Sequence, residues 1–223
     1  MKKKVLRSLT LLTFLVAALS VTVWAFSLIN QQPSRAENNS RKTLRDRARD
    51  RDVEEDVPDG ELNVEYASAG LLAKHAEAIV IGQIAAEESS FDGDDHLTTT
   101  YQVNVKQILK DVKLAAPLPA GQQSPPPLMT PLKVARPGGL LYVNGHKVSK
   151  KLRGSDALKV GKDYVFFLWW SPAYRAYTLA GGVSGAFSIE NDVTIKSLGS
   201  KDGMMSYNGS RLQALVDEIQ SAQ

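Results

Sequence analysis

The chain has 223 residues, an ordinary apolar content of 43% and a formal net charge of +3, so it can hold a targeting segment and one domain with a proper core. It contains no cysteine, which excludes disulfides, thiolate metal ligands, a cysteine nucleophile and a lipid-modified N-terminal cysteine. Basic residues near the N-terminus account for the net charge, and the chain from Glu61 onward is neutral. A nucleic-acid-binding surface is therefore not expected.

Residues 1–30 are predicted to be a signal anchor or a signal peptide. Residues 8–29 carry no charge, and at about 1.5 Å per residue this run can cross a hydrocarbon core of roughly 30 Å. Residues 23–25 and 34–36 offer the small residues of a cleavage site, whereas the length of the apolar run and Trp24 near its outer end favour an uncleaved anchor. Both alternatives place the rest of the chain outside the cytoplasm, either held at a bacterial cytoplasmic membrane by a single span or secreted.

Residues 31–60 are predicted to form a charged flexible linker. Arg, Asp and Glu dominate this segment, most densely over residues 45–52. With almost nothing to bury, it cannot offset its ordering entropy by packing. The linker would hold the domain off the membrane, and an arm that binds a partner is the alternative.

A short helix and a hairpin are expected to open the domain. Residues 68–76 read as a helix with Ser68 as a possible N-cap. A buried strand over residues 77–86 precedes an Asp-Gly turn. The return strand, residues 97–109, alternates apolar and polar residues, which predicts one face on the core and one in water.

A proline-rich insertion over residues 115–131 interrupts the strands, because proline lacks the amide proton that a sheet needs. Short strands are expected at residues 132–135 and 140–143, separated by Pro137-Gly138-Gly139. The basic segment that follows, residues 146–153, reads as a solvated loop.

The most informative strand is residues 160–170, where a turn leads into seven consecutive apolar residues. Alternate side chains of a strand point to opposite faces, and here both faces are apolar. The strand must therefore be covered on both sides, at the centre of the domain.

Three further strands are expected before a final amphipathic helix. The strands cover residues 176–179, 186–189 and 193–195. The helix, from residue 211 to about 221 with Ser210 as its cap, has one apolar face formed by Leu212, Leu215, Val216 and Ile219. We expect this C-terminal segment, residues 199–223, to pack on the barrel.

Many short strands with a flanking helix at each end predict a mainly β domain, a small barrel or sandwich, over residues 61–198. The segments 76–82, 98–105, 108–110, 137–139, 158–168 and 185–187, with Tyr177, resemble an uncharacterised exported bacterial family. That resemblance implies the OB-like barrel of tissue inhibitors of metalloproteinases (TIMP) and netrin (NTR) modules. Those inhibitors block zinc with an N-terminal cysteine, so their mechanism does not transfer to a chain without cysteine.

No catalytic, cofactor-binding or metal-binding residues are predicted. The histidines lack metal-ligand spacing to one another, and the aspartates of the hairpin turn lack the pattern of a calcium loop. Ser184 only approaches the nucleophile-elbow motif, since the motif's final glycine is missing and a strand follows it. An aromatic binding patch and core packing remain alternatives for Trp169, Trp170 and Tyr174. The histidines are His75, His96 and His146, and the aspartates are Asp92, Asp94 and Asp95.

The function expected from the sequence is a non-enzymatic, membrane-tethered binding or interaction module outside the cytoplasm. Its partner would be an unknown protein or a cell-envelope ligand, with no cofactor and no nucleic acid. The alternative is an exported protease inhibitor or hydrolase that acts through loops of the barrel.

Overall fold

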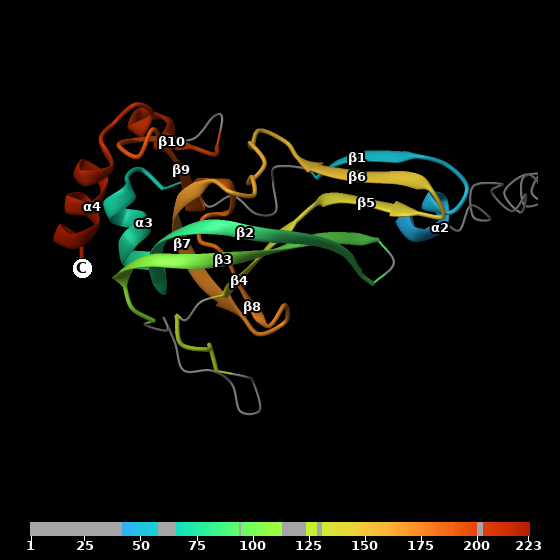
Figure 1. Cartoon of the computed structure of the whole chain (residues 1–223), viewed down its shortest axis with the longest axis horizontal. Coiled ribbons are helices and arrows are strands. Elements are labelled where there is room, and N and C mark those ends of the chain that lie inside the picture. The colour runs from blue at the N-terminus through green and yellow to red at the C-terminus, as the bar shows by residue number, and fades with distance from the viewer. Residues whose placement is uncertain (1–41, 58–65, 94, 113–123, 129–130, 200–202) are drawn as a thin grey trace, which may run out of the picture. The chain divides into compact units, whose positions relative to one another are not determined.

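A computed structural model describes residues 42–57, 66–93, 95–112, 124–128, 131–199 and 203–223. All of these except Lys42 belong to one compact unit, Thr43–Gln223. Two β-sheets make up most of this unit, so the prediction of a mainly β domain is confirmed (Figure 1). The predicted membrane span, residues 1–30, lies outside the described residues. Within the described ranges, no helix is long and apolar enough to cross a membrane.

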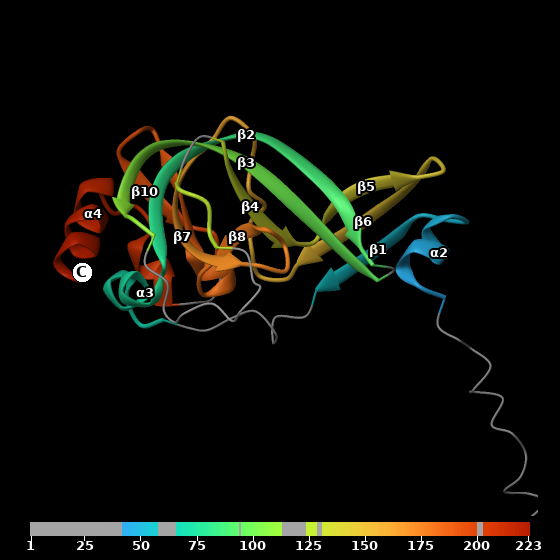
Figure 2. The same cartoon turned by 90° about the horizontal axis from the view of Figure 1, so that it is seen from below.

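The larger sheet has seven strands in the order β10-β9-β7-β2-β3-β4-β8, and β7 also pairs with β8. Five strands therefore close into a ring, which Figure 2 shows most clearly. The ring pairing of β4 with β8 is parallel, and the other four are antiparallel. The seven strands are β2 (Ala78–Asp92), β3 (His96–Lys110), β4 (Leu132–Pro137), β7 (Asp163–Ser171), β8 (Ala176–Leu179), β9 (Ala186–Glu190) and β10 (Thr194–Ser197).

Strand β7 is covered on both sides, as its two apolar faces predict. Tyr164, Phe166 and Leu168 belong to a buried cluster to which all five ring strands contribute, which places them inside the ring. Val165 and Phe167, on the opposite face, belong to a second cluster on the outside. The prediction made from residues 160–170 is thus confirmed.

Helices α3 (Ala69–His75) and α4 (Leu212–Ser221) cover the outer cluster. Ser68 caps α3, as expected, because its hydroxyl accepts a hydrogen bond from the Leu71 amide at 3.2 Å. The prediction that Ser210 caps α4 is wrong, since Arg211 holds the N-cap position without a side-chain bond. Short 3₁₀ turns, η2 (Gly182–Gly185) and η3 (Gly203–Tyr207), complete this side of the unit.

The smaller sheet has the order β1-β6-β5 and corrects two predictions. Residues 43–57, expected to be part of a flexible linker, form α2 (Leu44–Ala48) and β1 (Val53–Val57). The basic segment expected to be a solvated loop is β6 (His146–Leu152), which pairs in parallel with β1 and antiparallel with β5 (Gly139–Val143). These residues are not a flexible linker, because Leu44, Ala48 and Val53 become buried in a third apolar cluster.

The proline-rich insertion is described only in part, since residues 113–123 and 129–130 lie outside the described residues. Residues 124–128 form neither helix nor strand. Leu128 is buried in the ring cluster, and the Tyr177 hydroxyl donates to the Pro126 carbonyl at 3.0 Å. This part of the insertion is therefore fixed to the ring.

The long hairpin of β2 and β3 connects the two sheets (Figure 2). One half of the hairpin belongs to the ring, and its tip contributes Phe91 and Leu97 to the cluster under the smaller sheet. Three register shifts in the β2–β3 pairing let the hairpin bend around the ring. A cavity lies where the hairpin passes from the ring to the smaller sheet.

Candidate functional site

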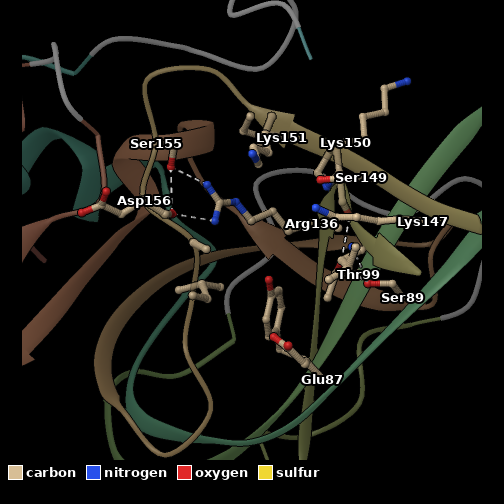
Figure 3. A pocket seen from close by; sticks show the side chains of 18 residues that line it. Glu87, Ser89, Thr99, Arg136, Lys147, Ser149, Lys150, Lys151, Ser155 and Asp156 are labelled. Atoms are coloured by element: carbon tan, nitrogen blue, oxygen red, sulfur yellow. Dashed lines mark hydrogen bonds between the residues drawn. The ribbon is translucent and has the colours of Figure 1, made fainter. Parts of the chain in front are cut away.

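The cavity has a volume of about 530 Å³ and is walled by both sheets. The ends of β2, β3 and β4 form its ring side, and β6 and residues 155–158 form the opposite side (Figure 3). The connection from β4 to β5 runs along it through Pro137, Gly138 and Gly139. Most of its polar side chains therefore come from strands rather than from loops.

Arg136 occupies an inward-facing position at the end of β4. Leu132 and Val134 lie in the ring cluster, and a strand's side chains alternate, so position 136 faces the same interior. Arg136 is 6% exposed. A guanidinium thus stands where the strand pattern places an apolar residue, at the boundary between the ring core and the cavity.

The hydrogen bonds of Arg136 hold it against the loop after β6. Its Nη1 donates to the Asp156 carbonyl at 3.0 Å, and its Nη2 donates to the Ser155 hydroxyl (Figure 3). Its Nε is buried, and no described residue accepts a hydrogen bond from it. Burial lowers the pKa of Arg136, while the neighbouring Tyr101, Tyr164 and Asp156 oppose that shift.

A chain of hydrogen bonds fixes the wall formed by the hairpin. The Leu140 amide donates to the Ser89 hydroxyl at 3.3 Å, the Ser89 and Thr99 hydroxyls lie 2.8 Å apart, and Thr99 donates to the Gly138 carbonyl at 2.8 Å. Gly139 has a φ of +141°, and a Cβ there would lie 2.1 Å from the Thr99 hydroxyl oxygen. Only glycine permits this close approach.

Three lysines of β6 line the wall of the cavity that the smaller sheet forms (Figure 3). Lys151 pairs with Glu54 at 2.5 Å, and Lys150 lies 3.9 Å from Glu55. Lys147 is exposed, and none of the described residues forms an ion pair with its ammonium group. The lysines therefore add positive charge to the cavity that holds Arg136.

Asp156 carries one of the two carboxylates that line the cavity, but its charge is already matched. Its carboxylate accepts a hydrogen bond from the Lys196 ammonium at 2.8 Å, which holds the pKa of Asp156 below its usual range. The other carboxylate, of Glu87, is exposed at the cavity's edge. No described carboxylate forms an ion pair with Arg136.

The structure does not bring together the three histidines, which were considered as metal ligands and not predicted to be such. His75 lies on α3, His96 opens β3 and His146 opens β6. Among the described residues, no group of three or more His, Asp or Glu side chains could hold a metal ion. Asp95 has a structural contact, since its carboxylate accepts a hydrogen bond from the Leu44 amide at 2.6 Å; Asp94 lies outside the described residues.

The other candidates lie away from the cavity. Ser184 is 1% exposed within η2, so a substrate cannot reach its hydroxyl. Trp170 is buried against Tyr177, with ring centroids 5.3 Å apart, and the half-buried Trp169 donates to the His75 carbonyl at 2.9 Å. Tyr174 is the exposed ring of this group, at 40%.

Sequence reasoning missed Arg136, although a signal for it was present. The residue follows the alternating Leu132 and Val134 with the same spacing and stands directly before the Pro-Gly-Gly break. A charged residue at an inward-facing position is unusual. At the end of a strand, such a residue indicates a candidate binding site at the edge of the apolar core.

The chain matches no protein-family model, and neither the curated proteins nor the solved structures contain a significant match to it. The chemistry of the site therefore rests on the geometry alone. The cavity presents hydroxyl groups and cations with room for a small molecule, an arrangement suited to binding.

Proposed function

We propose that the five-stranded ring is an OB-like barrel of the TIMP and netrin-module type. An OB-fold is a five-stranded Greek-key barrel. The ring here supports the assignment through its β2-β3-β4 meander, its return through β7 and β8, and the parallel pairing that closes it. In this proposal, the smaller sheet is an addition built from residues before the first barrel strand and between the third and fourth.

We propose that the protein is a non-enzymatic binding module, tethered to the membrane on the outer side of a bacterial cytoplasmic membrane. The cavity between ring and smaller sheet is the observation that carries the binding function. Its volume of about 530 Å³ falls within the range of roughly 300–1,000 Å³ typical of small-molecule sites. The cavity's polar groups lie on strands, so a ligand meets them already positioned.

Photo-cross-linking in intact cells tests the binding function. A photoreactive phenylalanine analogue at Leu140, which lines the cavity and is 48% exposed, should capture a molecule that the same analogue at Leu71 does not. Leu71 is a matched control because it is 43% exposed and lies on α3, on the ring's opposite side (Figure 1). Identical adducts at both positions, or none at Leu140, would contradict the proposal.

The absence of cysteine makes the location easy to test. A single cysteine in place of Tyr142, which is 67% exposed, should react with a membrane-impermeant maleimide in intact spheroplasts. Reaction only after lysis would place the domain in the cytoplasm and overturn the location. An epitope tag at the N-terminus, retained on the mature protein or lost from it, separates the anchor from the cleaved signal.

A further inference from the structure

We propose that the cavity at Arg136 binds a small organic anion, with the ligand's phosphate or carboxylate group held by Arg136 and Lys147. This inference rests on the proposed binding function and names the class of ligand. Arginine matches both oxyanions through its planar set of N–H donors.

Arg136 is a buried cation without a carboxylate partner among the described residues. A buried charge is costly unless it is paired and hydrogen-bonded. Arg136 is 6% exposed, its Nε has no acceptor among the described residues, and no described carboxylate pairs with it. An anion in the cavity would pair with this guanidinium.

The wall of the cavity is rich in positive charge. Four cations and two carboxylates line the cavity, and the Asp156 carboxylate is hydrogen-bonded to Lys196, outside the lining. Lys150 and Lys151 are matched by Glu55 and Glu54. Lys147 forms no ion pair with a described residue, although its charge also acts on Glu54, so a ligand meets Arg136, which no described carboxylate pairs with, beside a lysine that is only partly offset.

The size of the cavity and its apolar side chains indicate what the anionic group is attached to. The cavity exceeds the space that a bare inorganic ion needs, and Leu140, Leu152 and Leu158 line it together with the ring of Tyr101. An apolar or aromatic body attached to the anionic group would cover these side chains. The expected ligand therefore combines one anionic group with a small apolar part.

Calorimetric titration of the purified full chain in detergent, without phosphate in the buffer and at fixed ionic strength, tests this inference. Phenyl phosphate or benzoate should bind, and neutral benzyl alcohol should not. Dioctanoyl phosphatidic acid forms a further arm, because tighter binding of this lipid than of phenyl phosphate would assign the anionic group to a lipid headgroup rather than to a soluble molecule.

Three substitutions connect binding to the named residues. R136M should weaken binding of the anion by at least about 10-fold. K147M, at an exposed position, should weaken binding of the anion by about 2- to 5-fold. Because K147M keeps the hydrogen bonds of Arg136, it tests the inference even if R136M does not fold. K133M is the matched control, since Lys133 is exposed on β4 and does not line the cavity, and its affinity should equal that of the wild type.

Two results would overturn the anion inference while leaving the binding function in place. One is binding of benzyl alcohol as tight as that of phenyl phosphate. The other is capture of a ligand at Leu140 in cells by a chain that binds no anionic probe. Anion binding unchanged in both R136M and K147M would also overturn it, because the anion would then sit elsewhere.

Discussion

Side chains from several elements form hydrogen bonds with both ends of the short helix α3. At its N-terminus, backbone amides donate to Ser68, Tyr207 and Glu218. At its C-terminus, the ammonium group of Lys110 donates to the carbonyls of Ala73 and Ala76 at 2.8 and 2.5 Å. A helix of seven residues is marginal by itself, so these bonds help to fix it on the ring.

Lys110→Met should therefore lower the free energy of unfolding by about 1–2 kcal/mol, because the substitution removes a charged donor from the negative end of the helix. Chemical denaturation of the wild type and the variant measures the difference. Lys133→Met, which loses an exposed lysine of β4, should change stability by less than about 0.5 kcal/mol. Equal losses in the two variants would show that Lys110 does not cap α3.

Tyr177 makes stability depend on pH at the alkaline end. Burial, followed by the charges of Glu77 and Asp111, raises the pKa of Tyr177 from 10 to about 12. The folded protein thus holds this proton where the unfolded chain releases it, so the stability is present below pH 10 and is lost as pH rises toward 12.

Tyr177→Phe should reduce the loss of stability between pH 10 and 12, while at neutral pH it should cost about 1 kcal/mol for the hydrogen bond to Pro126. Denaturation curves across this pH range measure both effects. An identical alkaline decline in wild type and variant would assign the pH dependence to other groups.

At the level of whole elements, charge complementarity between β1 and β6 explains why neither strand could be predicted from its own sequence. The acidic β1 pairs in register with the basic β6, and three ion pairs cross between them: Glu54 with Lys151, Glu55 with Lys150, and Asp56 with Arg153. Each segment alone reads as solvated. Their pairing brings together positions that are far apart in the sequence, such as Asp52 and Lys147, which are 95 residues apart. Local sequence patterns cannot predict such a pairing.

The charged pairing predicts that β1 opens locally before the rest of the unit. Glu55 is the most enclosed acid of β1 and pairs with both Arg47 and Lys150. E55K should raise the amide hydrogen-exchange rate of residues 53–57 by about 5- to 10-fold without affecting β2. The double variant E55K/K150E should recover part of the protection. Equal exchange in wild type and E55K would mean that packing, rather than charge, holds the strand.

For the molecule as a whole, Gly139 at the start of β5 is a place where the smaller sheet packs directly against β2 and β3 of the ring. Gly139→Ala would place a Cβ 2.1 Å from the Thr99 hydroxyl oxygen and 2.5 Å from that of Ser89. It should lower the free energy of unfolding by about 3 kcal/mol or more. Gly145→Ala has a similarly positive φ of +85° but nothing within 4 Å, so it should cost only about 1–2 kcal/mol. Equal costs in denaturation experiments would rule out the steric contribution.

The sequence predicted the core of the molecule better than its site. The two apolar faces of residues 164–170 require a covered strand, and the structure has one there. The closure of the ring through β4 and β8 could not be predicted, because parallel pairing leaves no turn signal between the partners. The cavity lies between the ends of β2, β3 and β4 and the distant strand β6, a juxtaposition that local sequence patterns do not predict, so only the unusual position of Arg136 pointed toward it.

The closed ring also constrains the order in which the protein can fold. The β2–β3 hairpin contains local contacts and can form early, but β4 has no partner on its second edge until β8 arrives, beyond β7. A chain that emerges N-terminus first, from a ribosome or a membrane channel, therefore exposes an unpaired strand edge and the future ring interior for some time. Such non-local pairing predicts slow folding and a transient tendency to aggregate. Strand β1 cannot pair until β6, its partner, has been synthesised.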